Sequence, residues 1–290
     1  MSLLVRRPGP LSLVEDAGRP GHGAIGVSPS GAADRRSFAA GARLVGNDPA
    51  RHAAIETTLG GLVVEAVSEL TVALTGAACP AAVDDRPVAW GQTFVLAAGQ
   101  VLTLGTPRAG LRSYLSVAGG IDVPPVLGSR STDVLSDLGP PRLTAGMLLP
   151  VGDGRWSGAP VPEPHGEPTG TPVLQILSGI LQILPGPRTD WLDDIEPLTT
   201  TWQVSPASNR VGIRLTGPKL VRNPARSGEL PSEPLVRGAM QLPPSGRPVI
   251  FGPDHPTTGG YPVIAVLTEA ASDRLAQCRP GDLITLEWRG

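Results

Sequence analysis

The 290-residue chain is poor in the residue types that build disulfide scaffolds, metal centres and nucleic-acid-binding faces. Its two cysteines, Cys79 and Cys278, exclude a disulfide-rich scaffold and cannot form a Cys-based metal site alone. Only Lys219 among its 24 basic residues is lysine, and no basic stretch is dense enough to indicate nucleic-acid binding. We expect no metal site either, because metal-ligand spacing is missing among the four histidines: His22, His52, His165 and His255.

Long hydrophobic runs are also missing. No window approaches the roughly 20 apolar residues that a membrane-spanning helix needs. The N-terminal sequence MSLLVRRPGPLSLVEDAG lacks the apolar core of about 7–15 residues found in signal peptides. We therefore expect a cytoplasmic protein without membrane contacts.

Glycine and proline are abundant instead, with 37 and 33 residues. This density is too high for a helical bundle, and it separates short apolar runs, which is typical of many strands joined by turns. The sequence predicts a mainly β fold with a few short helices. The clearest helix is DRRSFAAGARLVGN (34–47), where Phe38, Ala42 and Val45 recur at helical spacing. A second helix is predicted at 271–278, capped by Asp273 or Ser272.

An internal repeat divides the chain. Three glycines of the first half recur 147 positions later, which pairs Gly91, Gly99 and Gly105 with Gly238, Gly246 and Gly252. LTGA at 74–77 likewise matches LTGP at 215–218. Shared glycines indicate shared turns, so we expect two related β-rich halves, each a closed or nearly closed barrel. The predicted halves span residues 1–155 and 172–290, and a Pro/Gly-rich linker at 156–171 joins them.

The segment FGPDHPTTGGY (251–261) concentrates polar chemistry at the mouth of one predicted strand. The equivalent loop of the first half, GTPRAG (105–110), is three residues shorter and has no carboxylate or histidine. Asp254 and His255 can move protons, and glycines let backbone N–H groups approach a ligand. The same residues also fit a simple Asx-turn with an aromatic anchor.

Three other segments allow both a functional and a structural interpretation. In GVSPSGAAD, Ser28, Ser30 and Gly31 can form a ligand loop before a helix, or Ser30 or Asp34 can simply cap that helix. Arg210, after Asn209 and just ahead of a predicted strand, can clamp a carboxylate or make a surface ion pair. The same two alternatives hold for Glu233 and Arg237.

Taken together, these segments resemble the biotin-dependent carboxyltransferase subdomain family, also called allophanate hydrolase subunit 2. The resemblance covers nearly the whole chain. It rests on five ordered motifs: GHGAIGVSPSGAADRRSF, RSYLSVAGGIDVPPVLGSRSTD, LPGPRTDW, SNRVGIRLTGP and SEPLVRGAMQLPPSGRPVIFGPDHPTTGGYPVIA.

The resemblance implies a fold of two cyclophilin-like β-barrel halves, in agreement with the repeat. It also implies assembly with a cyclophilin-like partner of the subunit 1 or B type. The family includes the C subunit of prokaryotic 5-oxoprolinase, which works with an A subunit of the lactam-utilisation type and uses ATP as a co-substrate. Biotin would have to come from another protein, because no lysine of this chain lies in a biotinyl-type context.

Family positions transfer to this sequence residue by residue. The resemblance implies catalytic roles for Asp254 and Tyr261. It implies substrate-binding roles for Ser28, Ser30, Arg112, Asn209, Arg210, Arg237, Thr257, Thr258, Gly259 and Gly260. His255 carries less weight, because relatives place other residues there.

The expected function is the C subunit of an ATP-dependent 5-oxoprolinase, which opens a small cyclic amide substrate and is active only with its partners. One alternative is a carboxyltransferase component that passes a carboxyl group from carboxybiotin to urea or a similar amide. Another is a non-enzymatic antagonist of a histidine-kinase inhibitor.

Overall fold

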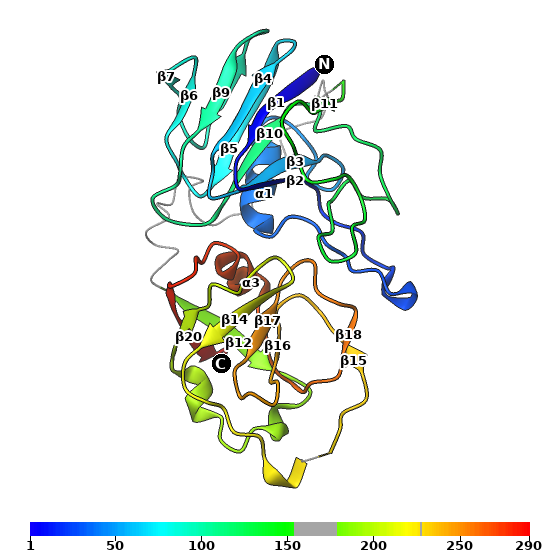
Figure 1. Ribbon diagram of the computed structural model, residues 1–290, viewed down its shortest axis with the longest axis vertical. Helices are drawn as coiled ribbons and strands as arrows, with labels where there is room; N and C mark the ends of the chain where they lie inside the picture. Colours follow the sequence, from blue (N-terminus) through cyan, green and yellow to red (C-terminus); the bar gives the residue numbers. More distant parts are fainter. Residues whose placement is uncertain (154–178, 227) are drawn as a thin grey trace. The chain divides into compact units, whose positions relative to one another are not determined.

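The computed structural model describes residues 1–153, 179–226 and 228–290, which form two compact units (Figure 1). Unit 1 contains Met1–Arg19, Ser30–Asp133 and, among the described residues, 137–153. Unit 2 contains the C-terminal part of the chain and two short segments from far upstream, Pro20–Pro29 and Val134–Ser136. The predicted linker, 156–171, lies outside the described residues, so the limits of the two halves stay a prediction.

Unit 1 consists of two antiparallel sheets (Figure 1). The six-stranded sheet has the order β11 (Leu148–Pro150), β1 (Ser2–Pro8), β4 (Leu62–Ala66), β9 (Val101–Leu104), β6 (Ala81–Val83) and β7 (Arg86–Pro87). The five-stranded sheet has the order β2 (Leu11–Glu15), β3 (Ala54–Thr58), β10 (Arg112–Val117), β5 (Leu70–Gly76) and β8 (Thr93–Leu96).

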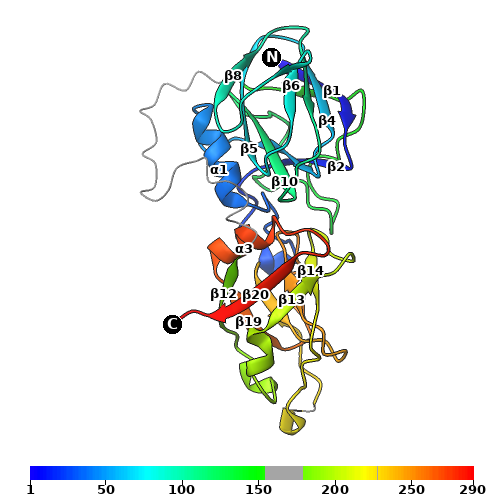
Figure 2. The same cartoon turned by 90° about the vertical axis from the view of Figure 1, so that its left-hand side faces the viewer.

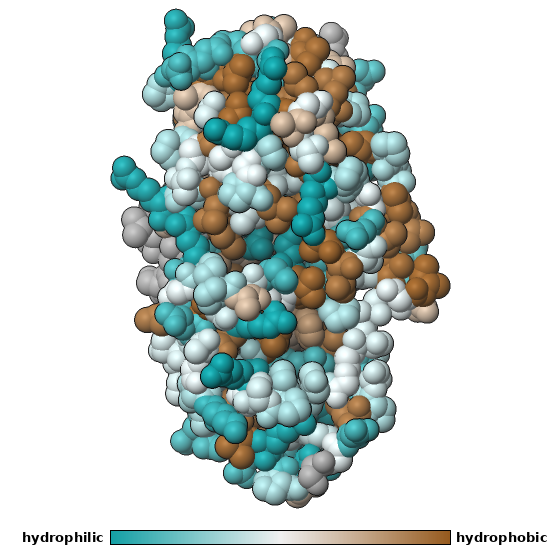
Figure 3. Space-filling view, in the orientation of Figure 1, coloured by the Kyte–Doolittle hydropathy of each residue, from teal (hydrophilic) through white to brown (hydrophobic). Residues whose placement is uncertain are grey.

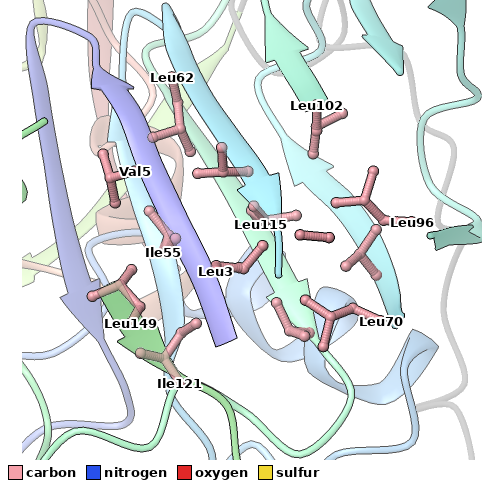
Figure 4. Packing of buried hydrophobic residues seen from close by; sticks show 14 of the residues in the cluster. Leu3, Val5, Ile55, Leu62, Leu70, Leu96, Leu102, Leu115, Ile121 and Leu149 are labelled. Atoms are coloured by element: carbon pink, nitrogen blue, oxygen red, sulfur yellow. The ribbon is translucent and has the colours of Figure 1, made fainter. Parts of the chain in front are cut away.

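Apolar residues at every second position build the core of unit 1. In β4, for example, Leu62, Val64 and Ala66 are buried, whereas the two residues between them are half-buried. Because side chains alternate across a strand, these residues share one face. Figure 4 shows this face packed with side chains of other strands, among them Leu3, Ile55 and Leu115.

Helix α1 (Arg35–Leu44) covers the other face of the five-stranded sheet, beside β5 and β10 (Figure 2). This explains why β10 is buried along its whole length. The predicted helix is confirmed, and Phe38 and Ala42 lie on its buried side. Asp34 is its N-cap, accepting a hydrogen bond from Ser37 N–H (2.9 Å), so the capping alternative applies to Asp34 and not to Ser30.

Unit 2 is a closed barrel. Its strand order is β12 (Ile180–Pro185), β19 (Val263–Leu267), β16 (Ala239–Gln241), β17 (Val249–Phe251), β14 (Gly212–Thr216), β13 (Thr201–Val204) and β20 (Leu283–Trp288). A parallel pairing of β12 with β20 completes the ring. Trp202 fills the interior, and its indole N–H donates to the carbonyl of Leu198 (3.0 Å).

Short elements surround this barrel. Strands β15 (Glu233–Pro234) and β18 (Thr258–Gly259) form a separate ribbon, and the 3-10 helices are η1 (Gly23–Ile25), η2 (Thr189–Trp191), η3 (Glu196–Thr199) and η4 (Pro224–Arg226). Helix α3 (Glu269–Leu275) is capped by Thr268, which accepts from Ala271 N–H (3.2 Å). The prediction of Asp273 or Ser272 as cap was wrong, because the helix begins earlier and both residues lie within it.

The mainly β prediction is confirmed. The runs that the repeat aligns form strands in both units. In this alignment β5 corresponds to β14, β8 to β16, β9 to β17 and β10 to β19. Their hydrogen-bonding partners differ, however: β5 pairs with β8 and β10, whereas β14 pairs with β13 and β17. The glycine repeat therefore marks strand and turn positions, not strand pairing. No helix in the described part of the chain is long and apolar enough to cross a membrane.

Candidate functional site

A buried ion pair joins Arg210 to Asp254 in unit 2. Arg210 precedes β14 and Asp254 follows β17, and these antiparallel strands pair Gly212 with Phe251. The register brings the start of one strand beside the end of the other, so the two side chains meet. Arg210 donates from Nε to Asp254 Oδ2 (2.7 Å) and from Nη2 to Oδ1 (3.1 Å). Arg210 is 2% exposed and Asp254 is 0% exposed.

Glycine is required at position 252 for this approach. A Cβ at Gly252 would lie 2.1 Å from the carbonyl oxygen of Arg210. The Gly252 N–H also donates to the carbonyl of Val211 (3.0 Å), which holds the two chain segments together. A larger residue here would push Arg210 away from Asp254.

The two upstream segments of unit 2 end at the same place. Val134 N–H donates to Asp254 Oδ2 (3.3 Å), and the Ser28 hydroxyl donates to the carbonyl of Pro253 (3.2 Å). Three residues, Arg210, Val134 and Ser28, thus donate hydrogen bonds to Asp254 and its neighbour. A carboxylate is fixed in orientation when it accepts two hydrogen bonds from one arginine and further hydrogen bonds from other donors.

His255 is buried beside this pair, with 2% of its surface exposed. Its Nδ1 lies 2.8 Å from the carbonyl oxygen of Pro256. Because a carbonyl only accepts, this geometry assigns the proton of a neutral imidazole to Nδ1. The ring is tilted against Phe251, with the ring centroids 6.4 Å apart.

The second half of the polar segment lies in the β15–β18 ribbon. Leu235 N–H donates to the carbonyl of Thr257 (2.9 Å), and Gly259 pairs with Glu233. A Cβ at Gly259 would lie 2.6 Å from Gln241 Nε2, so this glycine is required by packing. Thr258 and Gly260 are exposed.

Tyr261 follows the ribbon and is 45% exposed. Its carbonyl accepts a hydrogen bond from Gln241 Nε2 (2.8 Å). The guanidinium carbon of Arg222 lies 5.8 Å from the centre of its ring, within the range of a cation–π contact. The Tyr261 side chain is therefore the accessible aromatic group of this segment.

Asn209 and Arg237 of unit 2 have local partners. Asn209 Oδ1 accepts from the N–H groups of Val211 (2.9 Å) and Gly212 (3.1 Å), the pattern of an Asx-turn. Arg237 pairs with Asp273 (2.7 Å). Both side chains therefore have structural roles within the unit.

Glu233 pairs with Arg188, which donates from Nε to both carboxylate oxygens (3.0 and 3.2 Å). This hydrogen bond lowers the pKa of the Glu233 carboxyl from its ordinary value. Sequence reasoning did not identify Arg188 as the partner, because 45 residues separate the two.

Ser30 and Arg112 are both buried in unit 1, where Arg112 belongs to a second polar cluster. Glu56 accepts from Ala33 N–H (2.9 Å) and from the Tyr114 hydroxyl (2.8 Å), and its other oxygen lies 3.3 Å from Arg112 Nε. The Ser30 hydroxyl donates to the carbonyl of Thr132 (3.3 Å). Burial raises the pKa of Tyr114 well above its ordinary value, and the nearby carboxylates of Glu56 and Asp34 add to this.

Comparison with known proteins shows to which family this chain belongs. The sequence family described as "Carboxyltransferase domain, subdomain A and B" matches residues 25–288. The chain belongs to this family.

Relatives of the carboxyltransferase family match almost the whole chain. The 5-oxoprolinase C subunit of Escherichia coli (strain K12) is 42% identical over 289 residues, covering 97% of this chain and 89% of the relative. The urea amidolyase of Lachancea kluyveri is 34% identical and also covers 97% of this chain, but only 16% of its own length is matched. The crystal structure of the Kluyveromyces lactis urea carboxylase superposes with a TM-score of 0.87 at 32% identity, covering 98% of this chain and 27% of that one.

The structure gathers the predicted site residues of this family member into separate groups. Ser28, Arg210 and Asp254 meet in unit 2, and Thr257, Thr258, Gly259, Gly260 and Tyr261 continue the same segment. Arg237 and Asn209 have partners of their own in that unit, whereas Ser30 and Arg112 lie in unit 1.

Besides Arg188, sequence reasoning missed the Val134 N–H and the buried Glu56. Within the described ranges, no three His, Cys, Asp or Glu side chains are arranged to hold a metal ion.

Proposed function

We propose that this chain is the C subunit of an ATP-dependent 5-oxoprolinase complex, which hydrolyses the cyclic amide of 5-oxoproline to glutamate. The observation that carries the proposal is the 42% identity to the 5-oxoprolinase C subunit of Escherichia coli over nearly the full length of both chains. A second 5-oxoprolinase C subunit, from Haemophilus influenzae, supports it at 30% identity over 87% of its length. The urea amidolyases match this chain with only a small part of their length.

The proposal includes the assembly. A relative named as a subunit works with other subunits, and we propose a cyclophilin-like B-type partner and a lactam-utilisation-type A partner. ATP is the proposed co-substrate of the whole complex, and the cytoplasm is its proposed location. Hydrolysis adds water across the C–N bond, so that oxygen joins the carbonyl carbon and the nitrogen leaves as an amine.

Within the segment 252–261, we assign different roles to the exposed and to the buried residues. Thr258, Gly260 and the Tyr261 side chain are accessible, so we assign them the contacts with a small amide substrate. The phenol of Tyr261 can donate a proton to the leaving nitrogen. Backbone N–H groups of Gly259 and Gly260 are proposed to stabilise the developing oxyanion.

Asp254 is proposed to support the chemistry from its buried position. Its carboxylate is held by Arg210 and Val134, so it orients the segment that carries the accessible groups. Deprotonation of a nucleophile by Asp254 would require that this pair open within the assembled complex. Arg210 is bonded to Asp254, and Arg237 to Asp273, so substrate binding by either arginine also requires exchange of its partner.

The test is 5-oxoproline-dependent ATP hydrolysis and glutamate release by the complex of this chain with its A and B partners. The Asp254→Asn variant should lose most activity. Asp190→Asn is the matched control, because it makes the same chemical change in an exposed ion pair with Arg226 in the same unit. Since Asp254→Asn leaves a buried arginine without its counter-charge, thermal unfolding must show that the variant is folded at the assay temperature.

Activity in the wild-type complex that survives Asp254→Asn would keep the function and remove Asp254 from the mechanism. A wild-type complex without activity would contradict the proposal. The second candidate, carboxyl transfer, is favoured by the superposition on urea carboxylase. It would then be tested with carboxybiotin and urea as the acceptor.

A further inference from the structure

Arg222 is a half-buried arginine of unit 2 that lies against the accessible Tyr261. Its guanidinium carbon is 5.8 Å from the centre of the tyrosine ring. One hydrogen bond holds the group, from Nη2 to the carbonyl of Leu242 (2.5 Å). Its Nε is buried and has no hydrogen-bond partner among the described residues. Because buried donors are almost always satisfied in native proteins, this points to an acceptor that the unit itself does not supply.

Other arginines of the unit already have a carboxylate partner. They are Arg188, Arg210, Arg226 and Arg237, which pair with Glu233, Asp254, Asp190 and Asp273. Arg222 makes no ion pair within the described part of the chain. A guanidinium matches the geometry of a carboxylate and can bind it with two hydrogen bonds. Arg222 can therefore bind an external carboxylate without giving up a partner of its own.

The position of Arg222 is fixed on both sides of its side chain. The residues before and after it are bonded through their backbones to the segment 191–193. Leu242, which accepts from Arg222, donates from its own N–H to the carbonyl of Pro262 (3.0 Å), directly after Tyr261. A side chain that is held in place before its ligand arrives loses little conformational entropy on binding.

The neighbourhood has room for a small polar ligand. A Cβ at Gly260 would make one ordinary contact, 3.6 Å from the carbonyl oxygen of Leu230. Figure 3 shows mainly neutral and hydrophilic side chains, with few hydrophobic ones, on the surface where Figure 1 draws β15 and β18. Such a surface suits a small charged molecule better than an apolar partner.

We infer that Arg222 binds the carboxylate of 5-oxoproline. The inference rests on the proposed function, because it names the residue that recognises the substrate of that reaction. In 5-oxoproline the carboxylate and the lactam carbonyl are attached on the two sides of the ring nitrogen, so the groups that bind them must lie close together. Arg222 contacts Tyr261, which follows Gly260 and its proposed oxyanion-binding N–H. The arginine makes the site specific for a lactam that carries a carboxylate.

The test measures the KM for 5-oxoproline and the KM for ATP in the complex of this chain with its A and B partners. Arg222→Gln removes the charge and keeps an amide group at this position. The KM for 5-oxoproline should rise by at least about tenfold, because charge-assisted hydrogen bonds to the carboxylate are lost. The kcat should change little, since the carboxylate is bound equally in the ground state and in the transition state. The KM for ATP should stay the same.

Two further variants control this result. Arg226→Gln makes the same chemical change at an exposed arginine of the same unit, paired with Asp190, and should leave both KM values unchanged. Arg222→Lys keeps the charge without the planar fork, so its KM for 5-oxoproline should lie between those of the wild type and Arg222→Gln. If thermal unfolding shows that Arg222→Gln does not fold, a raised KM for 5-oxoproline in Arg222→Lys is the required result.

An unchanged KM for 5-oxoproline in the folded Arg222 variants would overturn the inference and leave the proposed function intact. A higher KM for ATP with an unchanged KM for 5-oxoproline would also overturn it, by assigning Arg222 to a phosphate. A loss confined to kcat would overturn it as well, since Arg222 would then act only through Tyr261. A wild-type complex without 5-oxoproline-dependent ATP hydrolysis would remove the proposed function, and the inference with it.

Discussion

Tyr114 and Glu56 face each other as paired residues of β10 and β3, and the tyrosine hydroxyl donates to the carboxylate at 2.8 Å. The same hydroxyl accepts from Asp34 N–H (2.8 Å) at the start of α1. One buried hydroxyl thus links the sheet to the helix that covers it.

Tyr114→Phe should therefore destabilise unit 1 without leaving a cavity. The change leaves the buried Asp34 N–H without its acceptor and removes one donor from Glu56. An unsatisfied buried polar group costs about 1–3 kcal/mol. Urea unfolding at pH 7 would measure this loss. Tyr261→Phe, at a 45% exposed side chain, should change the free energy of unfolding by less than about 0.5 kcal/mol. Equal effects of the two changes would contradict the assigned role.

The Arg210–Asp254 pair predicts a different response to single and double replacement. Asp254→Asn or Arg210→Gln should lower the free energy of unfolding by about 3–5 kcal/mol, because each change leaves the other member of the pair buried without its counter-charge. Arg210→Met combined with Asp254→Leu should cost less than either single change, since no charge remains buried. Chemical unfolding of the three variants checks this order. A double variant less stable than both singles would show that the pair is also needed for packing.

Cys79 predicts a pH dependence at alkaline pH. Burial raises the pKa of its thiol from 9.0 to about 11, against smaller opposing effects of hydrogen bonds with Ser113 and Gly105. Between these values the unfolded chain has lost the proton that the folded chain keeps. The contribution of the protonated Cys79 thiol to the free energy of unfolding is therefore complete below pH 9 and is lost as pH rises through about 11. The difference in unfolding free energy between wild type and Cys79→Ala, measured under reducing conditions, should fall over this window. A flat difference would contradict the raised pKa.

At Gly41 of helix α1, we expect replacement by alanine to lower stability, although alanine forms helices better than glycine. Alanine stabilises an exposed helical position by about 1 kcal/mol relative to glycine. Here a Cβ would lie 2.6 Å from Ser116 Oγ and 2.7 Å from Thr75 Oγ1, both on strands under the helix. We expect Gly41→Ala to destabilise by about 1–3 kcal/mol through overpacking. Adding Ser116→Ala should recover part of the loss, as measured by thermal unfolding. A stabilised single variant would mean that α1 can move off the sheet.

Local features were readable from the sequence. The spacing of Phe38, Ala42 and Val45 predicted α1, because it reports one helix face. Strand content followed from short apolar runs between glycines and prolines. The predicted cap of α3 was wrong. Thr268, three residues before the predicted start of the helix, is the cap, and Ser272 and Asp273 inside the helix are equally suitable residue types.

The site was readable only in part. Arg210 and Asp254 were both singled out, but with separate roles, Arg210 in substrate binding and Asp254 in catalysis. Their union depends on the pairing of β14 with β17, which carries no local signal. The Val134 contribution is a backbone N–H, and any non-proline residue supplies one. Long-range contacts of this kind come from the tertiary fold alone.

Closure of the unit 2 barrel by β12 and β20 has a consequence for synthesis on the ribosome. β12 is the first barrel strand to be made and β20 is the last, and each is the other's neighbour. Until Leu283–Trp288 has left the exit tunnel, β12 and β13 each present an unpaired edge. Such edges recruit other strands. The nascent second unit therefore stays open to intermolecular pairing until β20 has emerged and closed the barrel.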